Sequence, residues 1–484
     1  MTTNLLAFDL GAESGRAMLG RFDGQWLSLE QVHRFRNGPV RVFDSLYWNA
    51  LGLFEHMKQG LAAGGRAAAG PLASIGIDTW GVDYALLGED GALLENPHHY
   101  RDPRTNGVME KLFAVVPRQE VFEATGIQFM QLNTLYQLYA TRLARPRLLQ
   151  QARTLLMMPD LFHYWFTGRV ASEYSIATTT QFYDPRAGGW ARGLLGRLGI
   201  PDAILPPIVP PGTVLGPLLE PVASEAGVTP MPVVTPASHD TGSAVAAVPA
   251  QGQDWAFCSS GTWSLVGAEI QQPIITPETL AANFTNEGGV WGALRLLKNI
   301  SGMWLLEECR REWARQGAGL SYDELCGAAL AARPFAAILD PDDLSFLSPG
   351  AMPAKIAAFF RRTGQPVLES PGDMARAIFE SLALAYRSVL RKLEGILGRQ
   401  IRTLHIVGGG SRNAVLCQFT ADATGLEVVA GPEEATAVGN LLLQLMALGH
   451  LRTPAEAREL VRRSFEPRRY QPGPRQRWDE AAGA

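Results

Sequence analysis

Asp9 is the first residue whose place in the sequence indicates chemistry. It lies near the end of an apolar run at residues 5–10 that predicts a β-strand. An unpaired buried carboxylate is unstable, so Asp9 requires a cation or backbone donors beside it. Carboxylate oxygens suit Mg²⁺, and the following turn, Gly-Ala-Glu-Ser-Gly-Arg at 11–16, offers N–H groups to a phosphate. A solvated Asp in an ordinary hairpin turn is the alternative interpretation.

Two further turns could bind phosphate. Ser-Ser-Gly-Thr at 259–262 offers hydroxyls and amides, although a plain serine-rich turn has the same composition. Gly-Gly-Gly-Ser-Arg-Asn at 408–413 lies between a predicted strand at 404–407 and a predicted helix at 414–424. Three glycines at a strand-to-helix junction allow a ligand to approach the backbone and leave helix N-terminal amides free. The glycine loop therefore favours a ligand site.

Asp240 follows a predicted buried strand at 233–235 and precedes a run of small residues. A carboxylate at the carboxyl end of a strand is well placed to act as a general base. An N-cap role for Asp240 explains the same pattern. His239, taken alone, is more typical of a structural residue.

The segment Asp-Thr-Trp-Gly-Val-Asp at 78–83 joins two predicted strands, 75–78 and 82–87, which read as a hairpin crossing. A Trp face can stack on a sugar while carboxylates such as Asp83 accept hydrogen bonds from its hydroxyls, so the segment suits polyol binding. A core Trp in a tight turn is the alternative. The neighbouring His98 and His99 have no third ligand at a usual spacing, which disfavours a metal site there.

The elements that must position these residues alternate between short strands and longer helices, which predicts an α/β fold. Residues 5–10 and 17–22 predict a hairpin, and apolar residues at helical spacing predict a helix over 371–397 with Asp373 as its cap. The segments 5–15 and 255–262 share one form: a strand, a small polar turn and a second strand. Each begins a predicted domain, which suggests two similar domains whose turns face each other.

The 484 residues exceed one compact core, so at least two domains are expected. The turn-rich segment 248–253 predicts a boundary, giving domains 1–249 and 250–464 and a loose tail at 465–484. Ten prolines between 201 and 236 predict either an interdomain linker or a long ordered loop late in the first domain, and the predicted strand at 233–235 favours the loop.

Composition excludes several classes of function. A net charge of −4 shows no excess of basic residues, which binding to nucleic acid or to an anionic membrane would require. No lysine follows a glycine, so the Walker phosphate loop is absent, and no G-x-G-x-x-G motif occurs. The four cysteines are widely spaced, and the first residues lack a signal-peptide apolar stretch. The expectation is a cytoplasmic protein with free cysteines.

Taken together, these motifs resemble the FGGY family of carbohydrate kinases, in particular the branch that acts on L-rhamnulose. The resemblance runs in order over nearly the whole chain, to about residue 448. It is carried by Asp-Leu-Gly-Ala-Glu-Ser-Gly-Arg at 9–16, Asp-Thr-Trp-Gly-Val-Asp at 78–83, Tyr-Arg-Asp at 100–102, Ser-His-Asp-Thr at 238–241, Ser-Ser-Gly-Thr-Trp-Ser at 259–264 and His-Ile-Val-Gly-Gly-Gly at 405–410.

The resemblance implies two actin-like (ribonuclease H-like) domains flanking a catalytic cleft. It implies phosphorylation of L-rhamnulose at its 1-hydroxyl, with ATP as donor and Mg²⁺ as cofactor, by a monomer or small homo-oligomer. By resemblance Asp240 is the proton acceptor and Asp9 faces the metal. The residues that would contact the sugar are Gly81, His239, Asp240, Thr241 and Asn299. Those that would hold ATP are Ala12, Glu13, Ser14, Gly15, Arg16, Thr262, Glu307, Gly409 and Gly410.

Three positions depart from the family pattern. Glu307 stands where a glutamine is expected in the ATP site, Glu13 stands where a small residue is common, and Gln131 replaces a proline near the expected sugar pocket. Three alternatives stay open: a related kinase for fuculose, xylulose or ribulose, a sugar or nucleotide sensor without activity, and an actin-like ATPase switch. Loss of Asp240 or of the glycine loops would mark a sensor, and both are present.

Overall fold

A computed structural model describes residues 2–483 and divides the chain into two compact units. The first comprises the chain up to Pro249 with Glu269–Leu296 and Ala435–Phe465, and the second comprises Ala250–Ala268, Leu297–Glu434 and the chain from Glu466. The units are therefore not contiguous in sequence, whereas the predicted domains were. No helix within residues 2–483 is long and apolar enough to cross a membrane.

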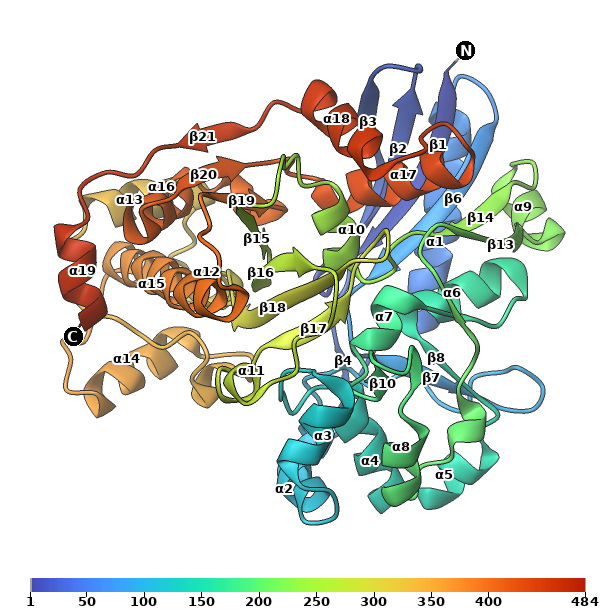
Figure 1. The fold of residues 1–484 in the computed structure, drawn as a ribbon, viewed down its shortest axis with the longest axis horizontal. Coiled ribbons are helices and arrows are strands. Elements are labelled where there is room, and N and C mark those ends of the chain that lie inside the picture. The colour runs from blue at the N-terminus through green and yellow to red at the C-terminus, as the bar shows by residue number, and fades with distance from the viewer. Residues whose placement is uncertain (1, 484) are drawn as a thin grey trace. The chain divides into compact units, whose positions relative to one another are not determined.

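The first unit is built on a six-stranded sheet in the order β13-β14-β6-β1-β2-β3. β1 pairs with β6 in parallel and with β2 antiparallel, and β6 pairs with β14 in parallel (Figure 1). The predicted hairpin at 5–22 is thus confirmed. The bounds of these strands are β1 Thr3–Leu10, β2 Ser14–Phe22, β3 Leu27–Arg36, β6 Leu72–Thr79, β13 Thr213–Pro217 and β14 Pro232–Thr235.

Helices α1 (Ala50–Ala67) and α17 (Ala435–Ala447) pack against opposite faces of this sheet. Gly60 and Gly64 of α1 lie against Phe8 and Leu6 of β1. Successive side chains of a strand point to opposite faces, so Asp9 lies on the face that α17 covers. The core on the α1 face continues to α6 (Met158–Thr167), where the rings of Phe8 and Phe166 stack with centroids 5.9 Å apart.

The remaining elements of the first unit include a helical portion with its own apolar core, whose most buried members include Leu135, Tyr136 and Phe182. The helices and 3₁₀ turns are η1 Pro103–Thr105, α2 Val108–Phe113, α3 Arg118–Thr125, α4 Thr134–Ala144, α5 Pro146–Gln151, α7 Tyr174–Thr178, α8 Arg192–Arg197, η2 Asp202–Ile204, α9 Glu220–Ala226, α10 Asp240–Ala246, α11 Pro277–Ala281 and α18 Pro454–Ser464. The short strands are β4 Val40–Val42, β5 Ser45–Tyr47, β7 Tyr84–Leu87, β8 Thr154–Met157, β9 Ser172–Glu173, β10 Tyr183–Asp184, β11 Gly189–Trp190, β12 Ile208–Val209 and β17 Thr285–Gly288.

A seven-stranded sheet has the order β17-β18-β16-β15-β19-β20-β21. β15 pairs antiparallel with β16 and in parallel with β19, which repeats the arrangement of β1 with β2 and β6. The sequence similarity between 5–15 and 255–262 therefore reflects a repeated topology. The bounds are β15 Trp255–Ser260, β16 Trp263–Ile270, β18 Leu294–Ser301, β19 Thr403–Val407, β20 Glu427–Ala430 and β21 Arg468–Tyr470.

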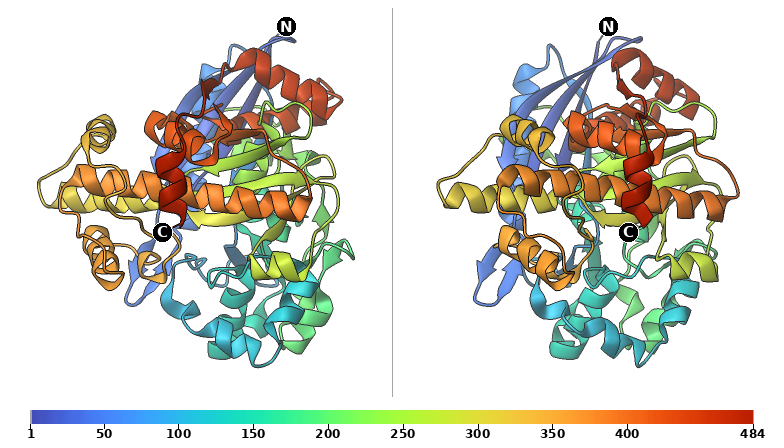
Figure 2. Two further views of the ribbon diagram at one scale, coloured as in Figure 1. Left: turned by 60° about the vertical axis from the view of Figure 1, so that its left-hand side comes forward. Right: turned by 90° about the vertical axis from the view of Figure 1, so that its left-hand side faces the viewer.

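The helices of the second unit are α12 Trp304–Arg315, α13 Tyr322–Ala331, α14 Met352–Arg362, α15 Pro371–Leu397, α16 Ala414–Thr424 and α19 Gln476–Gly483, with 3₁₀ turns η3 Leu344–Phe346 and η4 Gly409–Arg412. The long helix α15 packs against α13 and α16 (Figure 2). The predicted helix 371–397 is confirmed, but its N-cap is Ser370, whose Oγ accepts from the Asp373 amide. The prediction of Asp373 as cap was wrong because the shorter Ser side chain precedes the helix, as a cap must.

Two expectations about irregular segments were wrong. The proline-rich segment 201–236 carries β13 and α9 before the predicted strand at 233–235, which is confirmed as β14. Its prolines lie in the connections, at element ends or at the start of α9, where a missing N–H is tolerated. Residues 465–483 are not a loose tail. Trp478 of α19 is 6% exposed and packs edge-on against the rings of Phe335 and Phe419.

We expect Trp478→Ala to lower the free energy of unfolding by about 3 kcal/mol, because it removes a buried indole and leaves a cavity. Urea unfolding followed by circular dichroism measures the change. Trp26→Ala is the matched control, since Trp26 is 50% exposed, and it should change stability by less than about 0.5 kcal/mol. Equal effects of the two substitutions would contradict the packing of α19.

Candidate functional site

Asp9 and Asp78 lie side by side at the carboxyl ends of the parallel strands β1 and β6. Asp9 is 5% exposed and pairs with Arg16 across the hairpin, at 3.2 Å between Oδ2 and Nη2. Asp78 is fully buried; its Oδ2 accepts from Asn440 Nδ2 of α17 at 2.6 Å, and its Oδ1 has no hydrogen-bond partner. Burial and the negative charges of Asp9 and Asp240 hold the pKa of Asp78 well above its usual range, against the opposing effect of Asn440. Burial and the neighbouring carboxylates therefore favour the protonated, neutral form of Asp78.

Asp240 is the first residue of α10, five residues after β14 ends at Thr235. His239 occupies the N-cap position and makes no side-chain cap, so the prediction of Asp240 as N-cap is not what the structure shows. The Asp240 side chain is 28% exposed, and its Oδ1 accepts from the amide and hydroxyl of Thr241. Burial raises the pKa of Asp240, His239 opposes that rise, and the charge of Asp9 adds to it. The Asp240 carboxylate is therefore partly accessible from solvent and is a stronger base than an ordinary Asp side chain.

His239 stands beside Asp240, with 3.5 Å between its Nε2 and Asp240 Oδ1. Its backbone is fixed by a bridge to Thr79 at the end of β6 and by the Ser175 hydroxyl, which accepts from the His239 amide at 3.1 Å. A Cβ added to Gly81 would lie 3.3 Å from Nε2, so glycine gives the ring its space. The structure thus brings together the predicted residues Gly81, His239, Asp240 and Thr241 in the first unit.

The segment 78–83 is not a hairpin, which corrects the sequence prediction. β6 pairs with β1 and β14, whereas β7 pairs antiparallel with β8. The chain leaves one sheet at Thr79 and enters another at Tyr84, passing through Val82 at φ 67°. Strand propensity alone could not tell which partner each strand would choose.

Asp83 is fully buried, and its oxygens are taken by four N–H donors. Oδ2 accepts from Trp48 Nε1 at 2.6 Å, Trp80 Nε1 at 3.0 Å and the Tyr100 amide at 3.2 Å, while Oδ1 accepts from Gln137 Nε2 at 2.8 Å. The two indole rings lie 4.0 Å apart between centroids. The carboxylate therefore fixes aromatic side chains, which matches the core-Trp interpretation better than direct contact with a sugar.

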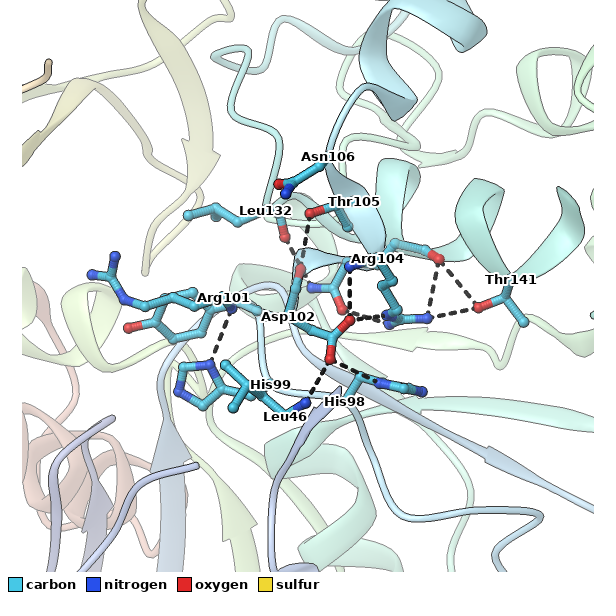
Figure 3. Close-up of polar contacts among 12 residues, drawn as sticks. Leu46, His98, His99, Arg101, Asp102, Arg104, Thr105, Asn106, Leu132 and Thr141 are labelled. Atoms are coloured by element: carbon cyan, nitrogen blue, oxygen red, sulfur yellow. Dashed lines mark hydrogen bonds and ion pairs between the residues drawn. The ribbon is translucent and has the colours of Figure 1, made fainter. Parts of the chain in front are cut away.

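The histidine pair next to Asp83 belongs to a structural network (Figure 3). Asp102 accepts from the amides of Leu46 and Arg104, and His98 Nδ1 lies 3.6 Å from it. Arg104 donates to Thr141 at 2.8 Å. His99 Nδ1 accepts from the Arg101 amide, and burial lowers the pKa of His99 to about 3. These contacts anchor η1 to the β5 strand and to α4.

The turn at 11–16 is closed by its own backbone. The Gly11 amide donates to Ser14 O at 2.9 Å, and Asn37 donates to the carbonyl oxygens of Gly11 and Glu13. A Cβ on Gly15 would lie 2.2 Å from the Phe35 ring, so this glycine is required by packing as well as by any phosphate.

In the second unit, the glycine loop packs on β15. A Cβ on Gly410 would lie 2.0 Å from Ser260 Oγ, and Gly408 has φ 81° with Ser260 O close by. A Cβ on Gly409 would meet no atom within 4 Å. Close packing thus explains two of the three glycines, and Gly409 is the one that faces open space.

The other predicted residues of the second unit lie on separate elements. The Thr262 carbonyl accepts from the amides of Gly302 and Trp304, which ties the 259–262 turn to the start of α12. Glu307 of α12 pairs with Arg310 at 2.8 Å, so its charge is balanced one turn later. Asn299 lies on β18, in the part of that strand that belongs to the second unit.

Two family models match the chain in succession: the N-terminal domain of the FGGY family of carbohydrate kinases over residues 4–247, and its C-terminal domain over residues 256–448. The chain belongs to the FGGY family of carbohydrate kinases. This FGGY kinase is 47% identical over 481 residues to a rhamnulokinase of Bacteroides thetaiotaomicron, covering 99% of the chain and 98% of the relative. It is 43% identical over 471 residues to a rhamnulokinase of Pectobacterium carotovorum, covering 97% and 93%.

Solved structures with the same fold include ligand-bound xylulose kinase from Lactobacillus acidophilus, with a TM-score of 0.81, 17% identity and coverage of 99% of this chain and 96% of that one. Plasmodium falciparum glycerol kinase with ADP has a TM-score of 0.76 and 13% identity, covering 100% and 97%. At these identities the likeness concerns the fold alone. The α/β two-domain fold expected from the sequence is confirmed.

Sequence reasoning about this FGGY kinase missed the residues behind His239. Glu173 is fully buried and accepts from the Ser238 amide and the Ser175 hydroxyl, which fixes the backbone before Asp240. Glu287 of β17 and Arg295 of β18 lie against the His239 ring. The stretch Asn-Glu-Gly-Gly at 286–289 carries no local signal that assigns Glu287 to His239.

The raised pKa of Asp83 predicts that the free energy of unfolding depends on pH. Burial raises the pKa of Asp83 from 3.8 to about 6, although Gln137, Trp48, Trp80 and Tyr100 oppose that rise. The folded protein therefore holds this proton more tightly than the unfolded chain, and the resulting stability is lost as pH rises through about 6. Relative to Asp83→Asn, which cannot titrate, the wild type should lose on the order of 3 kcal/mol of unfolding free energy between about pH 4 and about pH 7.

Urea unfolding of both proteins at several pH values measures that difference. If the unfolding free energies of the wild type and Asp83→Asn changed with pH in parallel, Asp83 would not titrate in this range.

Proposed function

We propose that this FGGY kinase phosphorylates L-rhamnulose at the 1-hydroxyl with ATP, releasing L-rhamnulose 1-phosphate and ADP. Full-length relatives named rhamnulokinase, 47% and 43% identical, support the substrate. The observation that carries the chemistry is the Asp240 carboxylate, which is partly exposed at the start of α10 with His239 3.5 Å away. The proposal also places the enzyme in the cytoplasm, where its free cysteines remain reduced.

Asp240 acts as the proton acceptor in this proposal. Phosphoryl transfer has a loose transition state, so the protein mainly positions the reactants while a carboxylate takes the hydroxyl proton. The raised pKa of Asp240 strengthens its basicity. Its Oδ1 is held by Thr241, which leaves Oδ2 for the sugar hydroxyl.

We infer that Gly81, His239, Thr241 and Asn299 contact the sugar. Gly81 leaves space next to His239 Nε2 that a side chain would fill. Asp83 is assigned a supporting role, because its oxygens already bind the indoles of Trp48 and Trp80.

ATP is assigned to the turn at Ala12, Glu13, Ser14, Gly15 and Arg16 and to loops of the second unit. Arg16 supplies a guanidinium at the turn, with 26% of its side chain exposed. In the second unit we assign Thr262, Gly409, Gly410 and Glu307. Gly409 has open space beside it, and the amides before α16 suit a phosphate.

The residues around Asp9 fit a magnesium ion. Asp9 lies at the carboxyl end of β1 and offers carboxylate oxygens, which Mg²⁺ prefers, while phosphate and water would supply its other ligands. Asp9 is the carboxylate assigned to it, and Asp78 lies beside it at the end of β6. When bound, Mg²⁺ supplies positive charge that stabilises the phosphates.

The substrate assignment predicts that L-rhamnulose gives the highest kcat/KM among L-rhamnulose, L-fuculose, D-xylulose and L-ribulose. ADP release in a coupled assay with Mg-ATP measures each ketose against a control without sugar. A faster reaction with another ketose would overturn the substrate and keep the kinase. ADP release that does not depend on any sugar would indicate an ATPase.

Asp240→Asn should lower kcat by at least about 100-fold, because it removes the base and keeps the side-chain shape. Calorimetric titration should show ATP binding within a few-fold of wild type. Asp202→Asn is the matched control, since Asp202 is an exposed partner of Arg192 at the surface, and its kcat should not change. Near-normal turnover of Asp240→Asn would remove Asp240 from the role of base.

A further inference from the structure

Arg295 is a fully buried guanidinium directly behind His239. Its Nη2 lies 3.2 Å from His239 Nδ1 and 3.4 Å from Glu287 Oε2, and its Nε donates to the Gly288 carbonyl at 2.9 Å. β17 and β18 supply these residues, and β17 packs against α7, whose Thr178 hydroxyl accepts from the Gly288 amide (Figure 1). The cluster is therefore anchored on rigid elements.

The contact between Arg295 and His239 fixes which ring nitrogen carries the proton. A guanidinium has N–H donors and no acceptor. A neutral imidazole has one donor and one acceptor nitrogen, so Nδ1 must be the acceptor when it faces Arg295. The proton then lies on Nε2, the nitrogen that faces Asp240 Oδ1 at 3.5 Å.

Glu287 favours the other tautomer of His239, in which Nδ1 carries the proton. Its Oε2 lies 3.4 Å from His239 Nδ1 and would accept a proton carried there. Nδ1 cannot donate to Glu287 and accept from Arg295 in the same neutral ring. Since Glu287 also lies 3.4 Å from Arg295 Nη2, the carboxylate can serve the guanidinium as counter-ion instead.

We propose that Arg295 is a positioning residue that holds His239 in its Nε2–H tautomer, so that the ring presents a donor to Asp240 and to the reacting sugar oxygen. Glu287 balances the charge of Arg295. An Nε2–H group attracts the Asp240 carboxylate, whereas an Nε2 lone pair would repel it. The catalytic consequence rests on the proposed function, but the tautomer itself does not.

The tautomer is measured directly by long-range ¹H–¹⁵N correlation spectra of the ¹⁵N-histidine-labelled full-length protein, with the His239 signals assigned by their loss in His239→Asn. The expected result is a protonated Nε2 and an unprotonated Nδ1 in the wild type at pH 7.5. A protonated Nδ1 in the wild type would overturn the proposal without any Arg295 variant.

Arg295→Met should move the proton to Nδ1, because Glu287 then becomes the partner of that nitrogen. We expect kcat with L-rhamnulose to fall about 100-fold with little change in the KM for ATP. Arg295→Lys keeps a donor-only cation and should restore the Nε2–H signal and part of kcat. Arg387→Met is the matched control: Arg387 is also buried, in α15, and its loss should leave the His239 tautomer unchanged.

Retention of the Nε2–H signal in Arg295→Met would overturn the role of Arg295. The measurement also separates the two proposals. If no ketose is phosphorylated but His239 shows Nε2–H, the proposed function fails and the tautomer assignment stands. If L-rhamnulose is phosphorylated while wild-type His239 is protonated at Nδ1, only the tautomer assignment fails.

Discussion

The parallel pairing of β1, β6 and β14 is the constraint on which the first unit's site depends. It aligns the carboxyl ends of the strands, which places Asp9 next to Asp78 and brings the start of α10 to the same edge. Parallel strands require crossover connections, so residues separated by more than two hundred positions meet there. Burial and the charge of Asp9 raise the pKa values of Asp78 and Asp240, which makes this edge suitable for a proton acceptor.

The polar groups that contact Asp9 and Asp240 are themselves held by buried polar groups. Glu173 fixes the backbone at Ser238, Asn440 binds Asp78, and Arg295 faces His239. Buried charge is stable only when it is paired or hydrogen-bonded, so each of these contacts also maintains the fold. Stability and positioning therefore depend on the same residues.

Local sequence patterns predicted much of the fold. The hairpin at 5–22, the helix 371–397 and the strand-to-helix junction at 407–414 follow from apolar periodicity and glycine placement, which depend on near neighbours. The repeated strand–turn–strand form correctly indicated a repeated topology. The pairing of the strands around 78–83 was mispredicted because the choice of a strand partner depends on distant segments.

By itself the sequence determined the family, the α/β class and the candidate residues Asp9, Gly81, His239 and Asp240, because motif spacing along the chain carries that information. Only the tertiary structure decided what each buried side chain touches. It directed Asp83 toward two indoles, and it placed Arg295 behind His239 through the packing of β17 and β18. The physical reason is that burial and hydrogen bonding depend on three-dimensional neighbours, which no local pattern specifies.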